Sequence, residues 1–162
     1  MKTSNTLHLF KKHFSLCMAG LFTTAMLTGC GQDPAITEFK NEMDAFCTRI
    51  SEIDSSINSI DAEAENAKSL LIDYLEDLDM EFKDFSELDF PEEFDYLESL
   101  ADESSSYMTE AVNSYKTAFS EEYNDDYADY AKENYSRAYK RVQIIITFLH
   151  GEQPEDVQIT ME

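Results

Sequence analysis

The sequence predicts an all-α protein that folds as an antiparallel bundle, most simply of four helices. Two observations support this prediction. No glycine stands between Gly31 and Gly151, and Pro91 is the one proline between Pro34 and Pro154, so long stretches lack helix breakers. Apolar residues also recur at alternating spacings of three and four, which is the period of a helix. The same pattern allows one alternative, a hairpin of two helices about twice as long.

The first helix is predicted to begin after Asp33, which can serve as its N-cap, with Pro34 at the first helical position. We expect a break near residues 55–61, where serine, asparagine and aspartate cluster, with Ser59 or Asp61 capping the next helix. The apolar positions of the first helix are Ile36, Phe39, Met43, Phe46, Ile50, Ile53, Ile57 and Ile60. Those of the second are Ala64, Ala67, Leu71, Tyr74 and Leu78.

Pro91 separates the second helix from the third. Residues 84–91 are predicted to form a loop, because the residue before a proline is biased away from the helical region. A third helix follows, and a break near residues 123–126 precedes the fourth, which is closed by Gly151. The third helix carries apolar positions Phe94, Leu97, Ala101, Met108, Ala111, Tyr115 and Ala118. The fourth carries Ala128, Ala131, Tyr135, Ala138, Val142, Ile145 and Leu149. The apolar residues around the proline are predicted to plug one end of the bundle: Phe85, Leu88, Phe90 and Phe94.

The first 29 residues have the layout of an export signal. Lys2, Lys11 and Lys12 precede a short apolar run over residues 14–26, and the segment contains no acid. The run is too short to cross a hydrocarbon core of about 30 Å, which needs roughly 20 apolar residues. It ends in Leu27-Thr28-Gly29-Cys30, an aliphatic residue, a small residue, glycine and cysteine.

Leu27-Thr28-Gly29-Cys30 resembles the lipobox of bacterial lipoproteins. The resemblance implies that Cys30 carries diacylglycerol, that cleavage occurs between Gly29 and Cys30, and that acyl chains such as palmitate anchor the protein. It also implies export to the outer face of the bacterial cell membrane or into the cell envelope. The alternatives are an ordinary secretory signal and an uncleaved signal anchor. The rest of the chain is similar to small helical lipoproteins of bacteria in architecture, which assigns no other functional residue.

The predicted organisation has four parts. A signal peptide covers residues 1–29, the lipidated cysteine and a short tether cover 30–32, the helical bundle covers 33–151 and a flexible tail covers 152–162. Because the tether is so short, the bundle and any partner are expected to lie close to the membrane face. The negative charge of the bundle disfavours lying flat on an anionic surface, so we expect it to stand away from that surface with its lipidated end down.

Charge and cysteine content restrict the possible partners. Residues 30–162 carry all 34 acidic residues and nine of the 12 basic ones, a net charge of −25. Such a field repels phosphates, so no nucleic-acid partner is expected. Cys47 is the one thiol left in the bundle, and we expect it to be buried and inert, with a redox role as the alternative.

Enzyme and metal signatures are weak in this sequence. His150 is the one histidine of the bundle, no catalytic arrangement can be built around it, and neither a catalytic residue nor a cofactor nor a specific metal site is predicted. Carboxylates are dense in residues 73–95 and 124–129, where calcium is conceivable, but neither stretch matches an EF-hand loop.

Tyr123, Tyr127 and Tyr130 form the candidate contact site. They recur at helical spacing among acidic residues, and tyrosine is favoured at interfaces. The competing interpretation places them on a widened core face of the helix. We therefore expect a non-catalytic lipoprotein that binds an envelope protein or glycan. The alternative is a carrier of a small ligand or cation, such as calcium, in the bundle interior or acidic loops.

Overall fold

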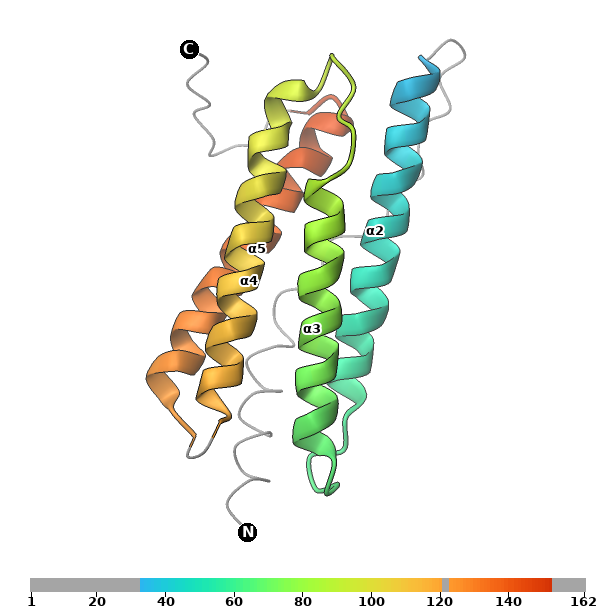
Figure 1. Cartoon of the computed structure of the whole chain (residues 1–162). Helices are drawn as coiled ribbons and strands as arrows, with labels where there is room; N and C mark the ends of the chain where they lie inside the picture. Colours follow the sequence, from blue (N-terminus) through green and yellow to red (C-terminus); the bar gives the residue numbers. More distant parts are fainter. Residues whose placement is uncertain (1–32, 121–122, 153–162) are drawn as a thin grey trace.

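The computed structural model describes residues 33–120 and 123–152 (Figure 1). The predicted signal peptide, the lipobox with Cys30 and nearly all of the predicted tail lie outside the described residues. Four long helices form the described part: α2 (Pro34–Ser59), α3 (Ala67–Ser86), α4 (Glu98–Ala118) and α5 (Asp125–Leu149). A single 3₁₀ turn, η1 (Asp95–Leu97), precedes α4, and no strand occurs in these residues. The predicted four-helix bundle is confirmed, and the two-helix hairpin is excluded.

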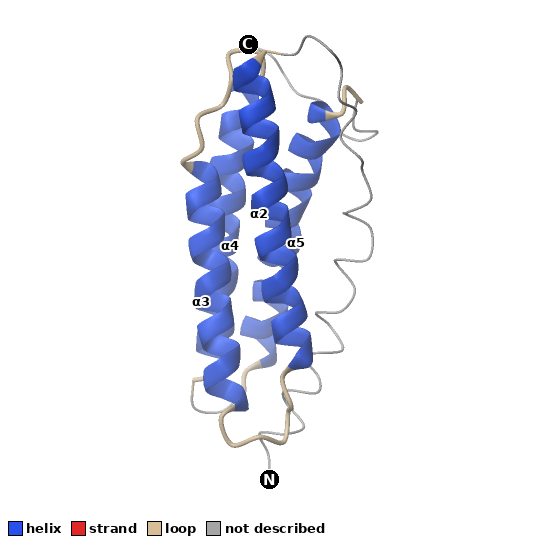
Figure 2. Ribbon diagram, turned by 90° about the vertical axis from the view of Figure 1, so that its right-hand side faces the viewer, coloured by secondary structure: helices blue, strands red, loops and turns tan. Residues whose placement is uncertain are grey.

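Successive helices run in opposite directions along the bundle (Figures 1 and 2). The start of α2, the end of α3 and the start of α4 lie at one end, which we call the Asp33 end. The loop between α2 and α3 and the loop between α4 and α5 lie at the other, which we call the Tyr123 end. A hydrogen bond of 2.8 Å from Lys68 Nζ, in the first turn of α3, to the carbonyl oxygen of Ser120, just after α4, links these two helices at this end.

Helix caps explain where α2 and α5 begin and where α5 ends. Asp33 Oδ1 accepts a hydrogen bond of 3.0 Å from the backbone N–H of Ala35, which confirms the predicted cap. Asn124 caps α5 by accepting from two backbone N–H groups of its first turn. Gly151 follows α5 with φ of 74°, a left-handed conformation that glycine adopts without strain.

Two predicted boundaries differ from the structure. Asp61 accepts from the backbone N–H of Glu63 inside the first loop, and α3 begins later, at Ala67, so neither Ser59 nor Asp61 caps it. The second boundary lies around Pro91: α3 continues to Ser86, into the predicted loop, and the α-helical part of α4 begins only at Glu98, after a turn and η1.

The buried faces follow the predicted apolar positions with a small rotation. Ile53 and Tyr74 are only partly buried, whereas Asp54 and Leu75, the next residues along, are fully buried. A strict seven-residue pattern drifts by roughly 20° per heptad on a straight helix, so a continued three-four spacing leaves the core face.

Aromatic rings fill the Asp33 end of the core, as predicted for the plug. The Phe46 ring stacks on Phe85 at 4.4 Å and meets Phe82 edge-on at 5.3 Å. Phe90, from the segment before Pro91, lies 4.6 Å from the ring of Phe39. The loop therefore folds back and packs its phenylalanine between α2 and α3.

Phe46→Ala is expected to lower the free energy of unfolding by about 3–5 kcal/mol, because Phe46 is fully buried and its removal leaves a cavity among rings. Denaturant unfolding followed by circular dichroism measures this loss. Met80→Ala is the control, because Met80 on α3 is 59% exposed and its truncation should change stability by less than about 0.5 kcal/mol. Equal losses in the two variants would contradict the packing described here.

Candidate functional site

A buried carboxylate joins the first long helix to the last. Asp54 of α2 is 3% exposed, and its two oxygens accept hydrogen bonds from two tyrosines of α5. Tyr135 Oη donates to Oδ1 at 2.9 Å and Tyr139 Oη donates to Oδ2 at 3.0 Å. The tyrosines are four residues apart, so they share one face of α5, and their rings lie 4.6 Å apart. We call these three residues the Asp54 cluster.

The apolar face of α2 carries Asp54 into the core. Asp54 lies four residues after Ile50 and three before Ile57, and both isoleucines are fully buried on that face. No lysine, arginine, histidine or glutamate is buried anywhere in the described residues. The Asp54 carboxylate is therefore held by hydroxyl groups, without a buried cation beside it.

This environment shifts two pKa values. Burial raises the pKa of Asp54 from 3.8 to about 6, although the hydrogen bonds from Tyr135 and Tyr139 oppose the shift. Burial also raises the pKa of Tyr135 well above its ordinary value, so its hydroxyl stays a neutral donor. The Asp54 cluster therefore contains a group that takes up or releases a proton near pH 6.

Cys47 is 5% exposed on α2, and burial, followed by the charge of Asp44, raises the pKa of its thiol to about 12. The thiol is protonated at neutral pH, which agrees with the buried, unreactive cysteine predicted from the sequence. His150 is exposed and follows the last residue of α5.

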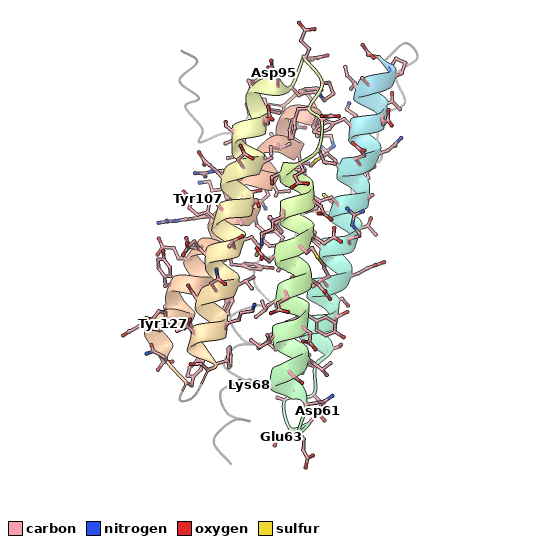
Figure 3. The ribbon with its side chains drawn as sticks, in the orientation of Figure 1. Asp61, Glu63, Lys68, Asp95, Tyr107 and Tyr127 are labelled. Carbon is pink, nitrogen blue, oxygen red and sulfur yellow. The ribbon has the colours of Figure 1, made fainter. Side chains whose placement is uncertain are left out.

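The predicted tyrosine site divides into a packed part and an exposed part. Tyr123 is half-buried, with its ring 5.3 Å from Phe119. Tyr127 and Tyr130 are 47% and 48% exposed. Figure 3 shows Tyr127 on the outer side of α5, toward the Tyr123 end. The core-face interpretation therefore fits Tyr123 but is wrong for Tyr127 and Tyr130, which form an exposed pair that we call the tyrosine rim.

A third feature, halfway along the bundle, connects α4 to α5. The guanidinium groups of Arg137 and Arg141 lie 5.6 and 5.5 Å from the centre of the Tyr107 ring (Figure 3). Arg137 also pairs with Glu133, and Arg141 with Glu103. Because each arginine is matched by a glutamate, this group packs two helices together and leaves little unmatched positive charge.

The described residues contain no group of three or more histidine, cysteine, aspartate or glutamate side chains placed to hold a metal ion. Within the same ranges, no helix is both long enough and apolar enough to cross a membrane. Gly29 and Cys30, the predicted cleavage and lipidation residues, lie outside the described part of the chain.

Comparisons of the chain with models of protein families, with characterised proteins and with solved structures gave no match.

Asp54 and Tyr139 are functional candidates that the sequence pattern did not single out. Asp54 could have been found as an acid seven residues after Cys47 and four after Ile50, on the core face of a helix. Tyr139 could have been found as the residue one turn after Tyr135, which was already assigned to the core.

Asp54→Asn is expected to gain stability relative to the natural chain as the pH rises from 5 to 8. The folded pKa of Asp54 lies above its unfolded value, so its stabilising contribution is complete below about pH 3.8 and is lost as the pH rises through about 6. The asparagine side chain of the variant carries no charge, so its contribution to stability does not fall as the pH rises. The relative gain is on the order of 1 kcal/mol, or about 4 °C in Tm, measured by thermal unfolding at both pH values.

Glu52→Gln is the matched control, because it removes one carboxylate from an exposed position on the same helix. A gain of the same size in this variant would assign the pH dependence to the general acidity of the surface instead of to Asp54.

Proposed function

We propose that this protein is a lipid-anchored, non-catalytic binding protein that presents the tyrosine rim to another component of the bacterial cell envelope. The observation that carries this proposal is the exposure of two neighbouring tyrosines, Tyr127 and Tyr130, on one helix. Met80 and Tyr96, the other large hydrophobic side chains that are exposed in the described residues, lie on α3 and η1. Single exposed apolar groups are ordinary on a surface, but paired tyrosines are typical of contact sites.

In this proposal the anchor and the rim lie at opposite ends of the bundle. Cys30 lies three residues before Asp33, so a lipid there would hold the Asp33 end of the bundle at the membrane. The 26 residues of α2 span about 39 Å at 1.5 Å per residue, and the rim lies toward the Tyr123 end. A partner that binds the rim would therefore meet it well above the membrane, instead of at the membrane face as expected from the tether alone.

The surroundings of the rim favour a partner with a basic surface. Asp125, Asp126 and Asp129 are all exposed on the same stretch of α5 as the two tyrosines. The whole sequence carries a net charge of −22, so its field attracts a cationic surface and repels an anionic one. A protein with lysine or arginine around an apolar patch fits this combination, and a neutral glycan that stacks on the rings is the other outcome of the test.

The anchor is tested with Cys30→Ala. Cells that express the full chain are fed radiolabelled palmitate, and the labelled protein and its presence in the membrane fraction are measured. We expect the substitution to abolish labelling and to release the protein from the membrane fraction or leave it unprocessed. Cys17→Ala is the control and should keep its label. Equal labelling of the two variants would contradict lipidation at Cys30.

The rim is tested by photo-crosslinking in living cells. A photoreactive phenylalanine analogue replaces Tyr127 in the full chain, and the crosslinked product is identified by mass spectrometry. We expect one dominant protein partner, and we expect Tyr130→Ala in the same chain to reduce that product severalfold. The analogue at Met80 is the control, since Met80 is exposed on α3, away from the rim. The same products from both positions, or none from Tyr127, would argue against the rim as a protein contact.

A further inference from the structure

We propose that the contact between α2 and α5, which we call a seam, responds to pH. The two helices pack together when Asp54 holds a proton, and they separate more readily when Asp54 loses it. The proposal rests on the geometry of the Asp54 cluster and is independent of the anchor and of the tyrosine rim.

The seam between α2 and α5 differs from the other three contacts between neighbouring helices. A loop joins α2 to α3 and a loop joins α3 to α4, and one inter-helix ion pair lies across each of these seams: Arg49 with Glu81, and Lys116 with Glu76. The seam between α4 and α5 has the pair of Arg141 with Glu103. In the described residues no ion pair joins α2 to α5, and the hydrogen bonds of the Asp54 cluster cross this seam.

The groups that face Asp54 leave its charge uncompensated. Tyr135 and Tyr139 face it from α5, and Tyr115 is the buried titratable residue of α4. Among its described residues, α3 contributes no buried titratable group, and α2 itself contributes Cys47. Burial raises the pKa of Tyr135 and of Cys47, so neither side chain carries a charge at pH 5 to 8. Loss of the Asp54 proton therefore places a negative charge in the seam that only two hydroxyl groups stabilise.

The direction of the effect follows from the proton affinities of the two states. In the closed seam the pKa of Asp54 is about 6, whereas a carboxylate in contact with water returns to about 3.8. The closed seam therefore binds the proton more tightly than the open one. Acid favours closure, and the ratio of open to closed seam rises roughly tenfold between pH 5 and pH 8.

Cys47 is a natural reporter of this opening. It lies seven residues before Asp54, which is two helical turns, so both side chains are on the same face of α2. At 5% exposure its thiol is shielded from a reagent while the helices stay packed. Movement of α2 away from α5 exposes Cys47 and Asp54 together, so the rate of thiol labelling follows the open fraction.

The experiment measures labelling of Cys47 by 4,4′-dithiodipyridine between pH 5 and pH 8. The full chain carries Cys17→Ser and Cys30→Ser, so that Cys47 is its one thiol. At each pH, the labelling rate of this chain is divided by the labelling rate of the same chain with Asp54→Asn. This division removes the pH dependence of the thiol chemistry. We expect the ratio to rise about tenfold from pH 5 to pH 8. A ratio that stays constant would overturn the proposal.

Glu52→Gln serves as the control in the same background, because it removes an exposed carboxylate two residues from Asp54. Its labelling rate should follow that of the unsubstituted chain at every pH. If Glu52→Gln reproduces the effect of Asp54→Asn, general repulsion between acidic helices opens the bundle, and the assignment to Asp54 is wrong.

Tyr135→Phe provides a second test that does not depend on the folding of the Asp54→Asn chain. It removes one hydroxyl donor while keeping the ring, so it weakens the ionised form of the cluster more than the protonated form. We expect faster labelling at pH 8 with little change at pH 5. An equal acceleration at both pH values would show that the hydroxyl acts through packing alone and would contradict the proposal.

Discussion

The apolar core has to hold four helices together against the mutual repulsion of an acidic surface. The chain carries 34 acidic and 12 basic residues, and Cys47 is a free thiol in the described bundle, so apolar packing is the main source of cohesion there. The stacked rings of Phe46 and Phe85 show how this is achieved, since large rings from adjacent helices fill the space that the repelling surfaces enclose.

The basic residues contribute a second, weaker effect. They are few, and three of them connect successive helices in exposed pairs, which add little free energy but fix the alignment of one helix on the next.

The Asp54 cluster is the exception within this core. An apolar residue at position 54 would make the seam between α2 and α5 more stable at neutral pH, because it would remove a desolvated carboxylate. The carboxylate instead determines the register of α5 on α2: each oxygen is matched to one tyrosine hydroxyl, and a shift of α5 by one residue would break both hydrogen bonds. Specific alignment and lower stability therefore arise from the same three residues. The seam for which we propose a pH response is also the one that no loop holds in place.

The fold was largely predictable from the sequence, and the reason is local. Asp33, Asn124 and Gly151 define helix ends through short-range interactions that the residue types alone indicate.

The end of α3 and the start of α4 were less predictable. Phe90 is drawn into the core beside Phe39, a contact between residues distant in sequence, and the chain forms a turn and η1 to reach it. The Asp54 cluster could not be predicted for the same reason. That Asp54 is buried follows from helix periodicity, but that Tyr135 and Tyr139 lie opposite it depends on how α5 packs across the bundle.

The exposed tyrosines and the buried ones lie on one helix, and this connects the surface of α5 to its interior. Tyr130 and Tyr135 are five residues apart, and the carbonyl oxygen of Tyr130 accepts a hydrogen bond from the buried Asn134 side chain. A ligand that fixes the tyrosine rim therefore acts on the same helical segment that carries the hydroxyl donors to Asp54. Loosening of α5 from α2 would leave α5 attached mainly to α4, where the arginines around Tyr107 hold it. The middle of α5 is thus attached on two sides: Tyr135 and Tyr139 contact Asp54 of α2, and Arg137 and Arg141 contact Tyr107 of α4. The most direct route for coupling between binding at the rim and the pH of the surroundings is the short segment of α5 from Tyr130 to Tyr135.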